Sequence, residues 1–190
     1  MISNDLLNKS EHEIRECSQD LWKYTFVNNM ESVQVNKYAI NNPGICGIHS
    51  KIISTYFSSP TFLEWLSKLT GIPDLQNDPD NEGGGIHRID NNGLLDIHAD
   101  FNRHASTKKY RRINILLYLN SNWEEKYNGQ LELWNKEMTQ CCHKIPPLFN
   151  RMVIFRITDD ANHGHPEPWL APDGYSRISF AFYYYTDDRP

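Results

Sequence analysis

The spacing of hydrophobic residues changes near the middle of the chain. In residues 4–24, isolated apolar positions are separated by polar ones at intervals that suit one or two amphipathic helices, and Ser10 with Glu13 fits a capping box. Residues 25–35 favour a strand or an extended segment, whereas residues 49–57 fit a helix or a strand equally well. The N-terminal part of the chain is therefore expected to be helical in the main.

A more clearly bounded helix follows. Residues 59–69 carry helical periodicity, Pro60 stands near the first helical position, and Gly71 with Pro73 marks the end. Proline suits the first turn of a helix because the missing N–H has no intrahelical acceptor there, and glycine suits the position after the last turn. The pattern predicts a helix here, followed by a polar loop over residues 75–81.

From Gly83 onward, short β-rich runs alternate with Gly, Asn and Pro, which is typical of antiparallel β-structure. The expected strands are Gly85–Ile89, Leu94–Asp100, Arg112–Leu119, Gln130–Trp134, Cys142–Ile145, Met152–Arg156 and Ser176–Thr186. No linker or repeat interrupts the chain, so we expect one α+β domain over residues 1–190. Helices in residues 1–82 would support a jelly-roll core in residues 83–186, whose mouth is a natural small-ligand pocket.

Composition removes several classes of function. The chain has 190 residues, 39% of them hydrophobic, which is enough for one domain with a core. Its net charge of −5 gives no general attraction to nucleic acid or an anionic membrane. Cys17, Cys46, Cys141 and Cys142 follow no disulfide-framework spacing, so we expect free thiols in a reducing compartment. No signal peptide or membrane span is visible, and a cytoplasmic protein is expected.

The pair His98 and Asp100 is the first candidate for chemistry. It lies on an expected strand, where residues two apart point to the same face. An imidazole and a carboxylate side by side can bind one metal ion, and a second histidine would complete the two-His-one-carboxylate set used for Fe(II). His163 or His165, in a histidine-rich turn, could supply it, and spacing alone leaves both open.

Several motifs in a fixed order resemble one family. They are His98-x-Asp100, Tyr118-Leu119-Asn120, Trp123, Asn128-Gly129-x-Leu131, Asn150-Arg151-Met152-Val153-Ile154-Phe155, His163-Gly164 and Arg177. This order resembles that of the Fe(II)/2-oxoglutarate-dependent oxygenases of the prolyl-4-hydroxylase type, over roughly residues 83–186. The resemblance implies a double-stranded β-helix, also called a jelly-roll or cupin-like core. It also implies a dioxygenase that uses Fe(II), 2-oxoglutarate and O2, with ascorbate as a supporting reductant.

The resemblance also assigns roles to individual residues. It implies that His98, Asp100 and His163 hold Fe(II), with His163 preferred over His165 because the family ligand usually precedes a glycine or similar residue. Arg177 would pair with the far carboxylate of 2-oxoglutarate, where a planar guanidinium gives a bidentate contact. The hydroxyls of Tyr118 and Ser179 would bind the same carboxylate, and Asn114, on the face of Tyr118, is a further candidate for cosubstrate contact.

The substrate side is less determined. His87, Arg88, Asn102, His165 and Trp169 are the candidate substrate-binding residues, although Trp169 could equally be a loop anchor. The basic run over residues 103–112 is either a solvated face or a means of steering an anionic substrate to the mouth.

Three functions remain in competition. The first is hydroxylation of an unactivated C–H bond in a small molecule, with decarboxylation of 2-oxoglutarate to succinate. The second is hydroxylation of a prolyl residue in a protein or peptide by the same chemistry. The third, from another class, is a non-catalytic metal-binding β-sandwich. The sequence does not settle the substrate, its regiochemistry or the oligomeric state.

Overall fold

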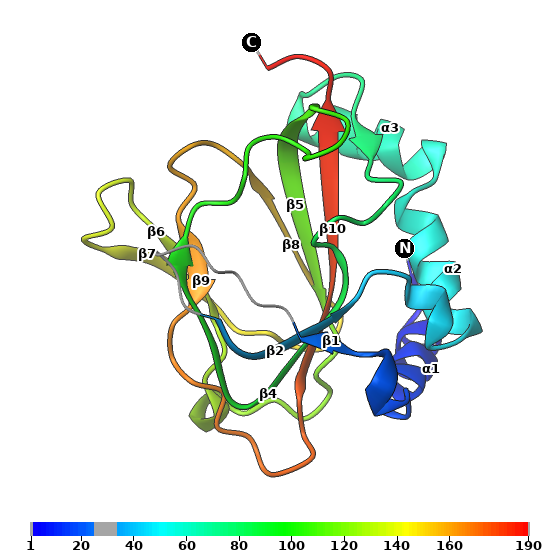
Figure 1. Ribbon diagram of the computed structural model, residues 1–190, viewed down its shortest axis with the longest axis vertical. Coiled ribbons are helices and arrows are strands. Elements are labelled where there is room, and N and C mark those ends of the chain that lie inside the picture. The colour runs from blue at the N-terminus through cyan, green and yellow to red at the C-terminus, as the bar shows by residue number, and fades with distance from the viewer. Residues whose placement is uncertain (1, 25–33, 190) are drawn as a thin grey trace.

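The computed structural model describes residues 2–24 and 34–189. The three α-helices lie within the first 70 residues and most of the strands follow them, as Figure 1 shows. The helical elements are α1 (Asn4–Arg15), η1 (Gln19–Leu21), η2 (Pro43–Ile45), α2 (Ile48–Phe57), α3 (Pro60–Thr70) and η3 (Glu125–Tyr127). The strands are β1 (Lys23–Tyr24), β2 (Gln34–Ile40), β3 (Gln76–Asn77), β4 (Gly85–His98), β5 (Tyr110–Tyr118), β6 (Leu131–Trp134), β7 (Cys141–Ile145), β8 (Arg151–Arg156), β9 (His163–His165) and β10 (Arg177–Thr186).

Helix α1 begins at a different cap from the expected one. Ser3 is its N-cap and accepts a hydrogen bond from the Leu6 amide, so Ser10 and Glu13 lie inside the helix and form no capping box. Ser10 is buried and its hydroxyl lies 2.9 Å from that of Ser50 in α2. The expected capping box was wrong because a stronger partner, the second helix, takes both side chains.

Glu13 serves the neighbouring helix instead. Its carboxylate accepts hydrogen bonds from the backbone amides of His49 (3.0 Å) and Ser50 (2.9 Å), in the first turn of α2. Those amides have no acceptor within their own helix. Gly47, the residue before α2, makes room for this contact, since an added Cβ would lie 2.1 Å from the Glu13 carboxyl carbon. Residues 49–57, which fitted a helix or a strand equally well from the sequence, therefore belong to the helix α2.

The prediction for α3 is confirmed. Ser59 caps its start by accepting from the Phe62 amide, Pro60 occupies the first turn, and Gly71 ends it in the left-handed conformation with φ 69°. Of the expected strand or extended segment over residues 25–35, residues 25–33 lie outside the described part of the chain, and β2 begins at Gln34.

All strand pairs in the sheet are antiparallel. The order is β7-β6-β9-β4-β10-β5-β8, with β2 also paired to β4 and β1, and β3 to β10. The sheet curls so that β6, β7 and β9 lie opposite the helices, which cover the other side (Figure 1). The α+β class and the jelly-roll core with N-terminal helices are thus confirmed.

Two local expectations about the strands were wrong. The two strands predicted over Gly85–Ile89 and Leu94–Asp100 are one strand, β4, because β2 pairs with both of its halves across Asn91 and Asn92. The histidine-rich turn is the short strand β9, which pairs with β4 on one side and β6 on the other. Neither pairing is visible in a local pattern.

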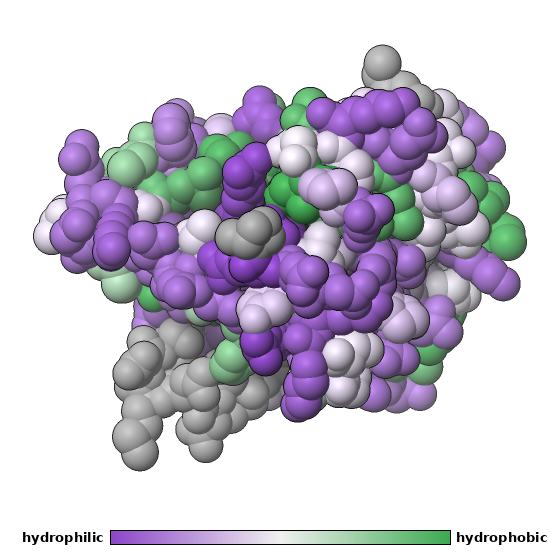
Figure 2. All heavy atoms as spheres, turned by 90° about the horizontal axis from the view of Figure 1, so that it is seen from above, coloured by the Kyte–Doolittle hydropathy of each residue, from purple (hydrophilic) through white to green (hydrophobic). Residues whose placement is uncertain are grey.

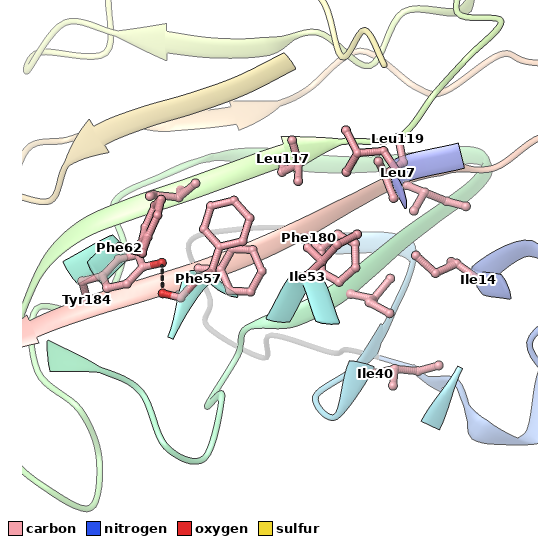
Figure 3. Packing of buried hydrophobic residues seen from close by; sticks show 14 of the residues in the cluster. Leu7, Ile14, Ile40, Ile53, Phe57, Phe62, Leu117, Leu119, Phe180 and Tyr184 are labelled. Carbon is pink, nitrogen blue, oxygen red and sulfur yellow. Dashed lines mark hydrogen bonds between the residues drawn. The ribbon is translucent and has the colours of Figure 1, made fainter. Parts of the chain in front are cut away.

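The main core lies between the helices and the adjoining face of the sheet. Figure 3 shows side chains from α1, α2 and α3 meeting those of β5 and β10. Phe57 of α2 stacks on Phe182 of β10 with ring centroids 4.3 Å apart, and the Tyr184 hydroxyl donates to the Phe57 carbonyl. This packing leaves the opposite, concave face of β4, β5 and β10 available for polar chemistry.

The surface seen from above in Figure 2 is mainly hydrophilic, with small separate hydrophobic areas. Within the described residues, no helix has the length and apolar character needed to span a membrane.

Candidate active site

The structure brings His98, Asp100 and His163 together at one end of the concave face. His98 is the last residue of β4, Asp100 follows it, and His163 begins β9, which pairs with β4 at His98. The Nε2 atom of His98 lies 3.6 Å from Asp100 Oδ1, and that of His163 lies 3.4 Å from Asp100 Oδ2. One donor atom from each residue falls within 4.8 Å of the others, which suits a single metal ion.

The hydrogen bonds of both imidazoles suit metal binding. The Nδ1 atom of His98 lies 2.8 Å from the Asp96 carbonyl, and that of His163 lies 2.8 Å from the Ala161 carbonyl. A carbonyl accepts only, so Nδ1 carries the proton and the Nε2 lone pair faces the centre of the group. Second partners of this kind fix the tautomer and ring orientation of histidine ligands. The three side chains therefore fit an Fe(II) ion held on one face.

Asp100 is held by two more residues of β5. Asn114 Nδ2 donates to Asp100 Oδ2 at 2.6 Å, and Arg111 Nη2 lies 3.5 Å from the same oxygen. Burial by itself raises the pKa of the Asp100 carboxyl. The nearby Arg111 guanidinium is the largest of the opposing influences, which together hold that pKa well below the ordinary 3.8. Asp100 is therefore an ionised, oriented carboxylate. Asn114 touches Asp100 and also lines the pocket, so its contact with the cosubstrate stays a prediction.

Arg111 was not among the expected site residues, because it lies in the basic run read as a solvated face or a steering patch. It is buried, its guanidinium carbon lies 3.3 Å from the centroid of the Tyr183 ring, and its Nε donates to Asn114 Oδ1 at 2.9 Å. In the pairing of β5 with β10, Arg111 faces Tyr185 and Ile113 faces Tyr184, so one extra residue forms a β-bulge. A bulge re-aims a side chain, and strict alternation would have pointed Arg111 away from Asn114.

A second bulge shapes β4 itself. The register with β9 pairs Leu95 with His165 and His98 with His163. These pairs are three residues apart on β4 but only two residues apart on β9, so β4 carries one extra residue. Gly164 between the histidines allows this close pairing, since a Cβ there would lie 2.7 Å from the carbonyl oxygens of Leu95 and Asp96. His165 lines the same pocket as His163 but is not one of the three clustered donors. Burial holds the pKa of His165 well below 6.5, so it is neutral.

Arg177 forms the other end of the pocket. It is 4% exposed, its Nε donates to the Gly129 carbonyl at 2.8 Å, and its Nη2 lies 3.4 Å from the Tyr118 hydroxyl oxygen. Over residues 2–24 and 34–189, no carboxylate lies within ion-pairing distance of it. A buried charge without a counter-ion is costly, so this end is suited to an anion.

The wall between the two ends combines apolar and polar groups. It is formed by Lys37, His87, Ile89, Leu95, Leu116, Leu131, Phe155, Ser179 and Tyr183. Ser179 and Arg177, two residues apart on β10, both line this pocket. Burial lowers the pKa of His87 to about 3 and that of Lys37 to about 8.

A scan of family models identifies the chain. The model described as the 2OG-Fe(II) oxygenase superfamily matches residues 84–185, which is more than half of the sequence. The chain belongs to this superfamily. It is an enzyme of the Fe(II)- and 2-oxoglutarate-dependent class, and O2 is the family's second cosubstrate.

Solved structures share the fold of this oxygenase at low identity. A Trichoplax adhaerens prolyl hydroxylase in complex with a hypoxia-inducible-factor peptide is 16% identical with a TM-score of 0.64, over 97% of this chain and 80% of that one. A Pseudomonas putida prolyl-4-hydroxylase is 16% identical with a TM-score of 0.63, over 97% and 88%. HygX from Streptomyces hygroscopicus, with nickel and 2-oxoglutarate bound, is 12% identical with a TM-score of 0.59, over 97% and 79%. The search of curated proteins finds no match.

The mouth of the oxygenase pocket opens into a larger cavity of about 680 Å³. His87, His98 and Asp100 belong to both spaces, so two of the three clustered donor residues lie at their junction. His104 lies at the rim of this cavity, where its Nε2 lies 3.1 Å from Asp78 Oδ1 and its Nδ1 accepts from the Ser106 amide at 3.3 Å. Both ring nitrogens are thus engaged in joining two loops beside the mouth.

Three of the expected substrate residues do not line either space. Arg88 projects from the opposite face of β4, where its guanidinium carbon lies 4.5 Å from the Trp22 ring centroid and Nε lies 3.1 Å from Asp90. Trp169 is fully buried and its indole N–H donates to the Tyr175 carbonyl at 2.8 Å, so it anchors a loop. The Asn102 amide donates to Asp159, away from the mouth. His87 and His165 do lie in the pocket.

Proposed function

We propose that this oxygenase hydroxylates an unactivated C–H bond of a small molecule and converts 2-oxoglutarate to succinate and CO2. One observation carries the proposal: the donors of His98, Asp100 and His163 converge in a narrow pocket that Arg177 also lines, from a position opposite Ile89, nine residues before His98 on β4. That separation of a metal face from a buried cation matches the two functional ends of 2-oxoglutarate. A non-catalytic metal-binding sandwich would have no need of Arg177.

Each residue is given one task. His98, Asp100 and His163 would hold Fe(II), which when bound supplies the activation of O2. Arg177, placed by Gly129 and Tyr118, would bind the far carboxylate of 2-oxoglutarate through charge-assisted hydrogen bonds. The Tyr118 and Ser179 hydroxyls would complete that contact. The apolar residues of the wall would reduce the access of water to the space between, which would strengthen these electrostatic contacts.

We propose a small molecule as the substrate because of the size of the cavity at the mouth of the pocket. The cavity of about 680 Å³ beside the metal ligands falls within the usual size of small-molecule pockets. Among the structural neighbours, HygX has hygromycin B bound and the Trichoplax enzyme has a peptide bound, so the fold serves both classes. A prolyl residue on a peptide is the second candidate, favoured by the TM-scores of the Trichoplax and Pseudomonas putida prolyl hydroxylases, 0.64 and 0.63, against 0.59 for HygX.

The first test is succinate release from 2-oxoglutarate with Fe(II), ascorbate and O2. We expect slow uncoupled release without substrate, and enhanced release when one compound in a panel of amino acids, sugars and nucleosides is accepted. Proline-rich peptides form the second arm, and enhancement by these alone would favour the prolyl alternative. Absence of any release above that of a His98→Ala control would refute the proposed oxygenase activity of this chain.

The second test concerns Arg177. Under anaerobic conditions, the absorption band of bound Fe(II) and 2-oxoglutarate reports cosubstrate affinity. Hydrogen bonds to a charged group contribute about 1.5–3 kcal/mol, so Arg177→Ala should weaken 2-oxoglutarate binding roughly 10- to 100-fold with metal affinity unchanged. Arg156→Ala is the matched control, because Arg156 is exposed on β8 and donates to the Thr70 carbonyl. Equal cosubstrate affinity in the two variants would remove Arg177 from the site.

A further inference from the structure

Two cysteines far from the active site lie in direct contact. Cys17 follows α1 and Cys46 ends η2, and their sulfur atoms are 2.9 Å apart. A disulfide bond is about 2.05 Å long, and thiols without a bond ordinarily remain farther apart than the distance seen here. Only a small approach of the two sulfur atoms therefore separates this contact from a covalent bond.

The surroundings favour this pair over other pairings. Cys17 is 8% exposed and Cys46 is partly exposed, so a small oxidant can reach Cys46 while Cys17 is shielded. Burial, followed by the contact with Cys17, raises the pKa of the Cys46 thiol, so little of it is ionised at neutral pH and its attack on an oxidant is slow. Cys141 and Cys142 are neighbours on β7, where successive side chains point to opposite faces and cannot bridge.

We propose that Cys17 and Cys46 form a reversible disulfide that ties the end of α1 to the loop before α2. The oxidant is a small-molecule disulfide such as oxidised glutathione. The Cys46 thiolate attacks one glutathione sulfur and releases one glutathione thiol. The Cys17 thiolate then attacks the Cys46 sulfur of the mixed disulfide and releases the second. Two cysteine thiols are oxidised, and one glutathione disulfide is reduced to two thiols.

The crosslink would close a loop over residues 18–45. That loop contains β2, which pairs with β4 from Ile86 to Leu95 and presents Lys37 to the pocket. Closing a loop of this length removes conformational freedom mainly from the unfolded chain, so the folded state is stabilised. For a chain of this size we expect the unfolding midpoint to rise by roughly 5–10 °C on oxidation.

The test uses the full chain, incubated with oxidised glutathione or with a phosphine reductant. After oxidation, tryptic digestion should give one species that joins residues 16–23 to residues 38–51, and reduction should separate them. The unfolding midpoint of the oxidised protein should exceed that of the reduced protein. Neither readout depends on iron, 2-oxoglutarate or turnover, so failure here is distinct from failure of the proposed reaction.

Variants sharpen the result. Cys46→Ser and Cys17→Ser should each abolish the joined peptide and the oxidation-dependent rise in midpoint. Cys141→Ser combined with Cys142→Ser is the matched control and should retain both. If Cys17 and Cys46 are recovered as separate alkylated peptides from the oxidised wild type, the proposal is overturned, and this measurement needs no variant to fold.

Discussion

Replacing Arg111 with glutamine tests how much the ion pair with the Asp100 carboxylate contributes to the stability of the fold. Arg111 faces this carboxylate only because of the β-bulge in β5. Arg111 and Asp100 have side chains only 8% and 17% exposed, and Nη2 lies 3.5 Å from Oδ2. Glutamine keeps much of the length and polarity but removes the charge. The variant therefore leaves a buried carboxylate without its nearest cation.

The magnitude follows from that geometry. At 3.5 Å and an effective dielectric constant of about 20, the Coulomb attraction is roughly 5 kcal/mol. Removing one partner of a buried pair costs about 3–5 kcal/mol in measured cases. Asn114 still donates to the same oxygen at 2.6 Å, and the cavity beside Asp100 admits water. We therefore expect the lower end, a loss of about 3 kcal/mol in the free energy of unfolding.

The assay is urea unfolding of the metal-free protein at pH 7. Arg112→Gln is the matched control, because Arg112 is less buried and its guanidinium donates to Thr186 Oγ1 and the Asp188 carbonyl, away from the site. Its expected loss is within about 0.5 kcal/mol. In an Asp100→Asn background, the effect of Arg111→Gln should shrink to the loss of the Tyr183 contact and of the hydrogen bond to Asn114, about 2 kcal/mol together. Equal losses for Arg111→Gln in both backgrounds would refute the reasoning.

Two further predictions concern a pH dependence and the third metal ligand. Burial opposes ionisation of Glu13, but hydrogen bonds from His49 and Ser50 outweigh it and hold the pKa of its carboxyl below 4.5. The stabilisation is therefore complete above pH ~4.5 and is lost as the pH falls through the folded-state value. Glu13→Gln should lower the urea midpoint at pH 7, and its difference from the wild type should shrink as the pH falls below 4.5; an offset independent of pH would contradict this. By titration with Mn(II), His163→Ala should lose binding at least 100-fold while His165→Ala stays within about fivefold; the reverse order would exclude His163 as the ligand.

Local sequence determined much of the architecture. The helix α3 follows from Ser59, Pro60 and Gly71, because a cap, a fixed φ and a left-handed residue act within one turn. Alternation with period two marked most of the strands, and the spacing of His98 and Asp100 on one of them was enough to suggest a metal face. Each of these signals works over a few residues, which is the range in which backbone preferences act.

The remaining residues of the candidate site are brought together only by the tertiary structure. His163 is 65 positions after His98 in the chain, and the pairing of β9 with β4 brings it, rather than His165, into the cluster with His98 and Asp100. A bulge in β5 turns Arg111 inward, while Arg88 and Trp169 are taken up by packing elsewhere.

The physical reason is the same in each case. Strand pairing and bulges are settled by contacts between segments far apart in sequence, and a shift of one residue moves a side chain to the other face of the sheet. The sequence by itself therefore determined which chemical groups this protein possesses and most of its local elements. Only the folded sheet decided which of those groups face one another.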